Sequence, residues 1–257
     1  MNKESRHLQS AWGALPVAVF ITAWEIVGRF DLFPGQFFFP PFSAVLKEFY
    51  YLTADGVLGK NFTSSLVRVV IGLCSGSIAG IFVGVVMGWR RVINGALNPI
   101  ISLLYPIPAL GWLPILMLWI GINEMLPITI IFICSFFPVV YNTATGIRNV
   151  DARYVRAAET LGASNMRILF KVIIPLALPN IFTGLRLEAG MSWRVLIAAE
   201  MVAIPTGIGA LLMQAESLVR VDIIMVCLIV LSIMCLLFER IFAFMEKRMI
   251  GKWSNHA

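Results

Sequence analysis

Ionisable side chains stand inside apolar segments of this sequence, where a charge is costly. Glu188, Arg194 and Glu200 share one such segment, and Arg68 lies in another. Groups of this kind usually pair with another charge or line the path of a polar solute. Arg194 and Glu200 are six positions apart, which is about 240° around a helix, so they do not share a face. We therefore predict that each of them faces another helix or a solute pathway.

The position of each charge within its segment refines this prediction. Arg194 lies nearest the middle, where a cation would favour the passage of an anion. The alternative is an ion pair with a carboxylate such as Glu200 of another helix or another copy. Glu188 and Arg68 lie nearer the ends of their segments, so we expect Glu188 to reach water and Arg68 to extend its side chain outward.

Few other residues offer catalytic or cofactor chemistry. The only histidines, His7 and His256, stand near the two ends of the sequence, and no GxxxxGK[ST] phosphate loop occurs. The four cysteines lie in apolar runs, and no two of them have the CxxC spacing of a zinc or redox site. The sequence therefore predicts neither an enzyme nor a metal or cofactor site on this chain.

The composition shows what kind of elements must position these side chains. Hydrophobic residues make up 59% of the 257 residues and charged residues only 13%, against roughly 25% charged residues in soluble domains. The net charge of +6 could indicate a nucleic-acid partner, but the basic residues cluster beside apolar segments, as in membrane proteins. We therefore predict an all-α, polytopic membrane helix bundle embedded in lipid, with no nucleic-acid partner.

Six apolar segments are long enough to cross a bilayer, which takes about 20 residues. With both termini in the cytoplasm, the inside regions hold most of the lysines and arginines, as the positive-inside rule requires. This orientation predicts a multi-pass protein with cytoplasmic N- and C-termini. The predicted spans are residues 11–29, 62–88, 95–120, 126–146, 184–204 and 222–244.

The third predicted span is interrupted by the segment YPIPALGWLP at 105–114. Pro106, Pro108 and Pro114 each remove a backbone donor and oppose a regular helix. Irregular backbone at membrane depth is tolerated only where it is buried in protein or lines a water-filled cavity. We therefore take Pro106, Pro108 and Trp112 as candidate pathway residues, with a kinked packing helix as the alternative.

Five glycines at four-residue spacing mark one side of the second predicted span. Small residues in this register let another helix backbone approach closely. The partner is either another helix of the same chain or a second subunit. The five are Gly72, Gly76, Gly80, Gly84 and Gly88.

A charged stretch at 151–179 interrupts the apolar pattern. Two short helical patterns meet there at Gly162, and the second stops at Pro175. Gly162 suits a helix C-terminal cap and Ser164 suits the N-cap of the next helix, which gives a bent, rigid pair. Its basic residues place the stretch in the cytoplasm. A loop with this charge and this much internal order predicts a docking surface for a soluble partner that supplies energy. The basic residues are Arg153, Arg156, Arg167 and Lys171.

The same loop resembles a pattern of the inner-membrane permeases of ABC importers, E-A-A-x-x-x-G-x(9)-I-x-L-P. In this chain it reads Arg156-Ala157-Ala158-x-x-x-Gly162-x(9)-Val172-x-Ile174-Pro175, with matching spacing throughout. Arg156 stands where the family pattern has its glutamate. This difference leaves the docking role intact but puts in doubt any ion pair that the glutamate would form. Further segments resemble the permeases that import nitrate, sulfonates, taurine and bicarbonate, over residues 60–245. They are 65–72, 105–124, 157–164, 173–190 and 198–201.

The resemblance implies a type I ABC importer permease fold, with 1–257 as one domain, a core at 60–245 and a coupling loop at 147–183. It implies two permease copies in a bacterial inner membrane, two cytoplasmic ATPases that carry ATP and Mg²⁺, and an external solute-binding protein. The cargo would be a small polar solute, an anion such as a sulfonate, nitrate, bicarbonate or a carboxylate. The residues implied in ATPase coupling are Arg156, Ala157, Ala158, Glu159, Gly162, Ala163 and Pro175.

Other classes of protein explain the sequence less well. An ion-coupled secondary transporter would use the charges of the fifth span, but such folds usually show inverted repeats, and the ordered basic loop would have no role. A membrane enzyme would lack an evident catalytic group. The scaffold subunit of a vitamin-type energy-coupling importer is nearer in function. Dependence of transport on ATP and on an external binding protein separates these classes.

Overall fold

Helices make up the protein in this computed structural model, which describes residues 3–30 and 39–254; no β-strand occurs within these ranges. In chain order the helices are α1 (Lys3–Arg29), α2 (Phe42–Ala54), α3 (Val57–Trp89), α4 (Arg91–Leu104), η2 (Ala109–Trp112), α5 (Leu113–Ile120), α6 (Met125–Arg148), α7 (Ala152–Thr160), α8 (Asn165–Ile168), η3 (Leu169–Ile173), α9 (Ile174–Ala203), α10 (Ile208–Ser217) and α11 (Val221–Ser254).

Four segments of the described chain are long and apolar enough to cross a membrane: Val57–Trp89, Met125–Arg148, Asn165–Ala203 and Val221–Met249. A fifth is formed if α4 and η2–α5, which meet at 88°, count as one broken span. The prediction of an all-α membrane bundle is therefore confirmed, and these segments coincide with the second to sixth predicted spans. The first, at 11–29, lies on α1, whose side chains are described from Leu15 onward, and it stays a prediction.

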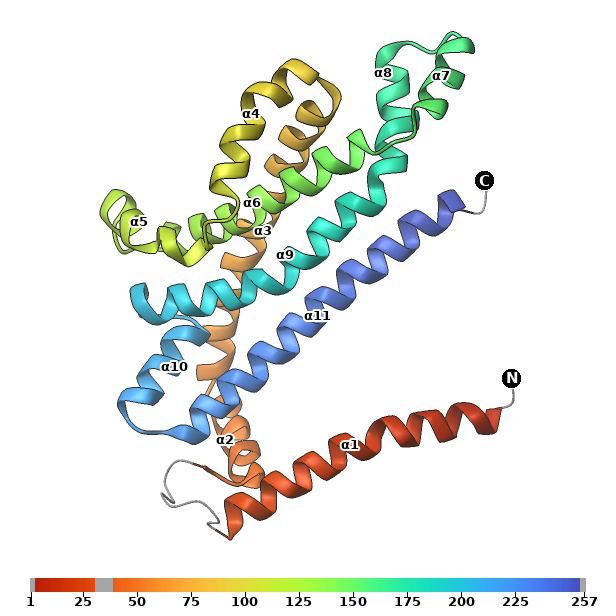
Figure 1. The fold of residues 1–257 in the computed structure, drawn as a ribbon. Helices are drawn as coiled ribbons and strands as arrows, with labels where there is room; N and C mark the ends of the chain where they lie inside the picture. The colour runs from red at the N-terminus through yellow and green to blue at the C-terminus, as the bar shows by residue number, and fades with distance from the viewer. Residues whose placement is uncertain (1–2, 31–38, 255–257) are drawn as a thin grey trace.

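The long helices form the body of the molecule, with α3 packed on α6, α6 on α9, and α9 on α11. Figure 1 shows the axes of α6, α9 and α11 roughly aligned, with α9 antiparallel to the other two. The short helices α7 and α8 lie at one end of this bundle, toward which the C-terminal end of α11 also points, and α2 and α10 lie at the opposite end. The charged loop therefore projects from the end of the bundle that also holds the α3–α4 connection, opposite α2 and α10.

The glycine row of α3 faces α6. A Cβ atom added at Gly72 would lie 2.7 Å from the Cβ of Ile131, and one at Gly84 would lie 2.6 Å from the Cβ of Thr143. Real side chains do not tolerate such distances, so the two helices are as close as they are because the glycines have no side chain. The row thus serves packing within the chain, one of the two alternatives from the sequence. Similarly close contacts to α6 are made by Gly76, Gly80 and Gly88.

The helical path does not stop at Pro175, and that prediction was wrong. α8 continues through the π-helical turn η3 into α9, whose first turn contains Pro175. A proline ring clashes with the carbonyl four residues earlier, here that of Lys171, and the wider π-helical turn at Leu169–Ile173 accommodates it. The fifth spanning helix therefore begins well before the predicted boundary at 184.

Candidate functional site: a cavity at the broken span and a docking surface

The third span is interrupted between Leu104 and Ala109, within the proline-containing segment identified from the sequence. α4 ends at Leu104, and the chain then turns through Pro106 and Pro108 before η2 begins, so that the two halves of the span meet at 88°. Pro114 lies in the first turn of α5, where its missing N–H would have no helical partner. The break is therefore confined to a short connection between two regular pieces.

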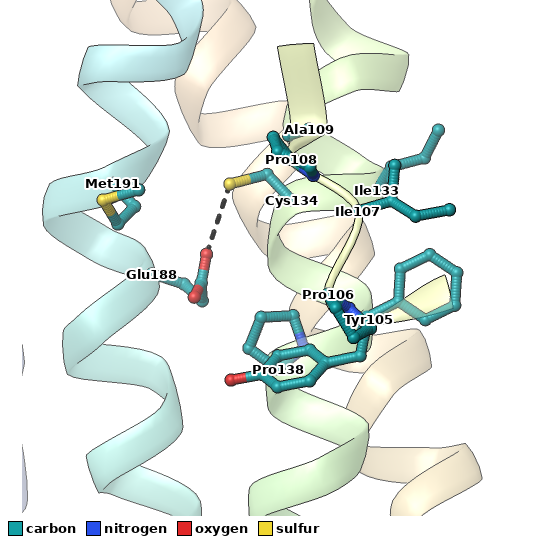
Figure 2. Close-up of a pocket in the computed structure, with 11 residues that line it drawn as sticks. Tyr105, Pro106, Ile107, Pro108, Ala109, Ile133, Cys134, Pro138, Glu188 and Met191 are labelled. Atoms are coloured by element: carbon teal, nitrogen blue, oxygen red, sulfur yellow. Dashed lines mark hydrogen bonds between the residues drawn. The ribbon is translucent and has the colours of Figure 1, made fainter. Parts of the chain in front are cut away.

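A cavity of about 370 Å³ lies between this connection, α6 and α9 (Figure 2). Its volume falls in the range of roughly 300–1,000 Å³ that is typical of small-molecule sites. Pro106 and Pro108 line it from the connection, Cys134 and Phe137 from α6, and Glu188 from α9. The break in the span thus creates a mainly apolar chamber with one carboxylate.

Glu188 belongs to the wall of this cavity and is only 6% exposed. Its Oε2 accepts a hydrogen bond from Sγ of Cys134 at 3.3 Å (Figure 2). The expectation that Glu188 reaches water at the end of its span was wrong, because α9 begins at Ile174 and places it well inside the helix. Among the described residues that line the cavity, Glu188 alone carries a charge.

Arg68 is buried, with 2% exposure, and does not extend outward as expected. Its Nε and Nη2 donate to the two carboxylate oxygens of Glu124 at 2.7 and 2.8 Å, and its Nη1 donates to Glu200 at 2.6 Å. Nη1 and Nη2 also donate to the carbonyl and the hydroxyl of Thr206, at 2.8 and 2.7 Å. Arginine suits such a cluster because its planar fork binds several oxygens at once.

The same cluster fixes the start of α10. The backbone N–H of Ile208 donates to Oγ of Ser65 at 2.9 Å, and that of Gly209 donates to Oε2 of Glu200 at 3.0 Å. These N–H groups belong to the first turn of a helix and have no partner within it. Side chains of α3 and α9 therefore hold α10 in place.

The structure brings two of the five predicted pathway residues, Pro106 and Pro108, to the cavity. Trp112 packs beside it, against an apolar cluster of α5, α6 and α9. Glu200 lies fully buried in the ionic cluster with Arg68. Arg194 is exposed on α9 and lines a second cavity, of about 470 Å³, between α9 and α11. Arg194 and Glu200 thus face different surroundings, as their spacing predicts.

Cys134 is a cavity residue that the sequence did not identify. A signal was available in Pro138, which lies one turn further along α6 and lines the same cavity. In the part of the chain that the structure describes, no three His, Cys, Asp or Glu side chains form a group that could hold a metal ion. The chemistry of the cavity therefore rests on Glu188 and on its aromatic and apolar walls.

Gly162 ends α7 in the left-handed conformation, with φ of +77°. Its N–H donates to the carbonyl of Glu159 at 2.9 Å, and the N–H of Ala163 donates to that of Ala158 at 3.0 Å, which are the two bonds of a Schellman motif. No other atom lies within 4 Å of the place where a Cβ would be. Glycine is therefore favoured here by the backbone conformation and not by lack of space.

The other end of α7 is capped by Asp151. Its carboxylate accepts hydrogen bonds from the backbone N–H and from Nε of Arg153, both at 2.8 Å, and these bonds lower the pKa of Asp151. Ser164 stands at the N-cap of α8, as predicted, but its side chain makes no capping hydrogen bond. The loop is thus a pair of short helices joined by a defined turn.

This pair exposes apolar and basic side chains to solvent. We call them together the α7–α8 surface; they are Tyr154, Arg156, Leu161, Met166 and Arg167. Leu161 is 88% exposed, Met166 61% and Tyr154 57%. On the inner side, Ala158 and Ala163 pack against the apolar cluster that anchors the loop to α9. Of the predicted coupling residues, the exposed ones are Arg156, Ala157, Glu159 and Gly162, and the half-buried ones are Ala158, Ala163 and Pro175.

Comparison with known proteins identifies the relatives of this chain. A family model described as a binding-protein-dependent transport system inner membrane component matches residues 76–251. A putative ABC transporter permease of Methanocaldococcus jannaschii is 36% identical, over 90% of this chain and 88% of its own. The taurine transport system permease protein TauC of Escherichia coli is 35% identical, over 91% and 86%, and the nitrate import permease protein NrtB of Synechocystis is 33% identical, over 92% and 88%.

Solved structures share the fold. A chain of an amino acid ABC transporter matches with a TM-score of 0.62 and 18% identity, over 77% of this chain and 97% of that chain. The MetNI methionine ABC transporter matches with a TM-score of 0.57 and 16% identity, over 70% and 92%. At these identities the likeness concerns the fold alone. With the family match over most of its length, the chain belongs to the binding-protein-dependent transport system inner membrane components, the permease subunits of ABC importers.

Proposed function

We propose that this permease passes a small polar solute, received from an external solute-binding protein, to the cytoplasm, and that two ATPases drive two copies of it. The relatives named for taurine, nitrate and bicarbonate favour a small solute with an anionic group as cargo. ATP and Mg²⁺ belong to the ATPases in this proposal. Both termini and the α7–α8 surface lie on the cytoplasmic side.

The α7–α8 surface is the observation that carries this proposal. It combines exposed apolar side chains, led by Leu161 at 88%, with the guanidinium groups of Arg156 and Arg167. An exposed apolar patch rimmed by charge is typical of a protein–protein contact, and arginine makes charge-assisted hydrogen bonds with a partner's carboxylates. An ATPase that binds this surface would fit both features.

The anchoring of the loop explains how movement would be transmitted. Ile168 and Ile173 are buried in the cluster that joins the loop to α6 and α9, and the helix continues without a break into α9. α9 carries Glu188 into the cavity wall. A displacement of α7 and α8 by the ATPase would therefore tilt α9 and change the cavity.

We assign the solute pathway to the cavity beside Pro106 and Pro108, completed by a second copy of the permease. Arg194 lies on the exposed face of α9 and would line the path beyond this cavity. Trp112 packs beside the break and would hold its shape. Glu200 would keep α10 in place from within the ionic cluster.

The test uses Leu161→Asp, which places a charge at the most exposed apolar residue of the α7–α8 surface. The matched control is Leu218→Asp, at a leucine with 70% exposure in the turn between α10 and α11, at the other end of the bundle. Loss of a central interface residue costs about 2 kcal/mol or more, or roughly 30-fold in affinity. We expect Leu161→Asp to lose the co-purifying ATPase and ATP-dependent uptake while Leu218→Asp keeps both. Full uptake by Leu161→Asp would contradict the proposal.

A further inference from the structure

The cavity in Figure 2 holds a charge that an anion pathway does not explain. Glu188 is 6% exposed, and its side chain accepts one hydrogen bond, from the thiol of Cys134 at 3.3 Å. None of the ion pairs among the described residues involves Glu188. A thiol is a weak donor and does not balance a buried carboxylate. Among the described residues, Glu188 therefore has no cationic partner.

The remaining walls of the cavity suit a cation better than an anion. Tyr105, Phe137 and Met191 contribute aromatic and polarizable surface, and none of the described residues that line the cavity is a Lys, Arg or His. The ring of Tyr105 is held by stacking on Tyr141, with centroids 5.4 Å apart and planes 4° from parallel. Aromatic faces attract cations, whereas a carboxylate in a chamber with few polar groups repels an anion.

We propose that Glu188 binds a protonated amine of the transported solute, so that the cargo is a small zwitterion with an ammonium group and an anionic group. This inference rests on the proposed function and narrows its class of cargo. The anionic group has a nearby cation in Arg194, which lines the adjoining cavity; the two cavities share Met191. The volume of about 370 Å³ is ample for such a solute.

The structure offers a native reporter for this site. Cys134 lines the cavity next to Glu188, and N-acetylcysteine amide in the same buffer supplies the reference rates for a thiol with no neighbouring charge. Methanethiosulfonate reagents of similar size exist with an ammonium or a sulfonate end. Each forms a mixed disulfide with a cysteine sulfur and releases methanesulfinate. Peptide mass spectrometry reads the modification rate of each cysteine separately in the complete importer in lipid nanodiscs.

The proposal predicts a preference for the cationic reagent at Cys134. The ratio of cationic to anionic modification rates there should exceed the ratio for N-acetylcysteine amide by about tenfold, as expected for one charge at close range in a partly shielded site. Glu188→Gln should bring the ratio at Cys134 to within about twofold of that for N-acetylcysteine amide, while Glu188→Asp should keep the preference. Because both rates are read on one thiol, its intrinsic reactivity cancels.

A second experiment measures how well two solutes protect Cys134 from modification. 2-Aminoethanesulfonate should slow the modification of Cys134, and ethanesulfonate, which lacks the amine, should not. Equal ratios at Cys134 and for N-acetylcysteine amide would overturn the proposal. So would a preference that survives Glu188→Gln, equal protection by both solutes, or a Cys134 that neither reagent reaches. A cationic side chain of the second copy that paired with Glu188 would also remove the preference for the cationic reagent, and the cargo would then need no ammonium group. Co-purification of the ATPase is measured on the same samples, so failure of this inference is distinct from failure of the proposed function.

Discussion

Replacing Arg68 by methionine removes the cation from the buried ionic cluster at the α10 end of the bundle. Methionine fills most of the arginine's volume but makes none of its hydrogen bonds to Glu124, Glu200 and Thr206. Glu124 is 66% exposed at its side chain and can turn to water, whereas Glu200 has no exposed surface. The cost of the change therefore falls mainly on Glu200.

Removing one partner of a buried ion pair typically destabilises a protein by about 3–5 kcal/mol. Glu200 keeps two other donors, the hydroxyl of Ser65 and the N–H of Gly209, at 2.9 and 3.0 Å. We therefore expect a loss of free energy of unfolding near the lower end of that range, about 3 kcal/mol. At about 2–4 °C per kcal/mol for a chain of this size, the melting temperature should fall by about 6–12 °C.

The assay is thermal unfolding of the purified protein in detergent, followed with a thiol-reactive dye that labels the buried Cys227 and Cys235 as they become exposed. Glu124→Gln is the matched control and should cost at most about 1 kcal/mol, since the Glu124 side chain is 66% exposed and its amide oxygen still accepts from Arg68. Arg68→Met combined with Glu200→Gln should recover part of the loss, because the neutral amide still accepts from Gly209. A melting temperature of Arg68→Met equal to that of Glu124→Gln would refute this reasoning.

Three further predictions test other parts of the structure. Gly162→Val strains the left-handed backbone by about 1–2 kcal/mol and should reduce the ATPase recovered with the permease, whereas Gly162→Asn should be milder. Gly84→Ala puts a Cβ 2.6 Å from that of Thr143 and should lower the yield of monodisperse protein on gel filtration, whereas Gly95→Ala, which meets open space, should not. The hydrogen bond from Arg68 lowers the pKa of Glu124, so the stability that this pair contributes is complete above the ordinary value of 4.5 and is lost as the pH falls through the lowered pKa. The difference in melting temperature between the wild type and Glu124→Gln should accordingly be constant from pH 8 to about pH 5 and vanish in stronger acid.

The sequence was sufficient for those features that depend on local chemistry. Hydropathy located the spans of α3, α6, α9 and α11, because lipid requires long apolar helices. Prolines located the break after Leu104, since a proline opposes a regular helix wherever it stands. Gly162 was identified as a cap because a left-handed residue after a helix favours glycine.

Features that depend on tertiary contacts were not predictable in this way. Arg68 is 56 positions from Glu124 and 132 from Glu200, and no periodic pattern connects residues so far apart. The burial of Glu188 depends on where α9 begins. The π-helical turn before Ile174 lets the helix continue past Pro175, so α9 begins earlier than the sequence predicts. The residues that pair with the buried charges are therefore known only from the structure.

The most direct measurement of the central claim is photo-cross-linking at the α7–α8 surface in the native membrane. A photoreactive amino acid replaces Leu161 in the tagged permease, and the same amino acid at Leu218 serves as the control at the other end of the bundle. We predict that position 161 forms an adduct between the permease and an ATP-binding subunit, and that position 218 does not. If position 161 gave no adduct with an ATPase, or gave one only as often as position 218, the docking of the ATPase on this surface would be contradicted.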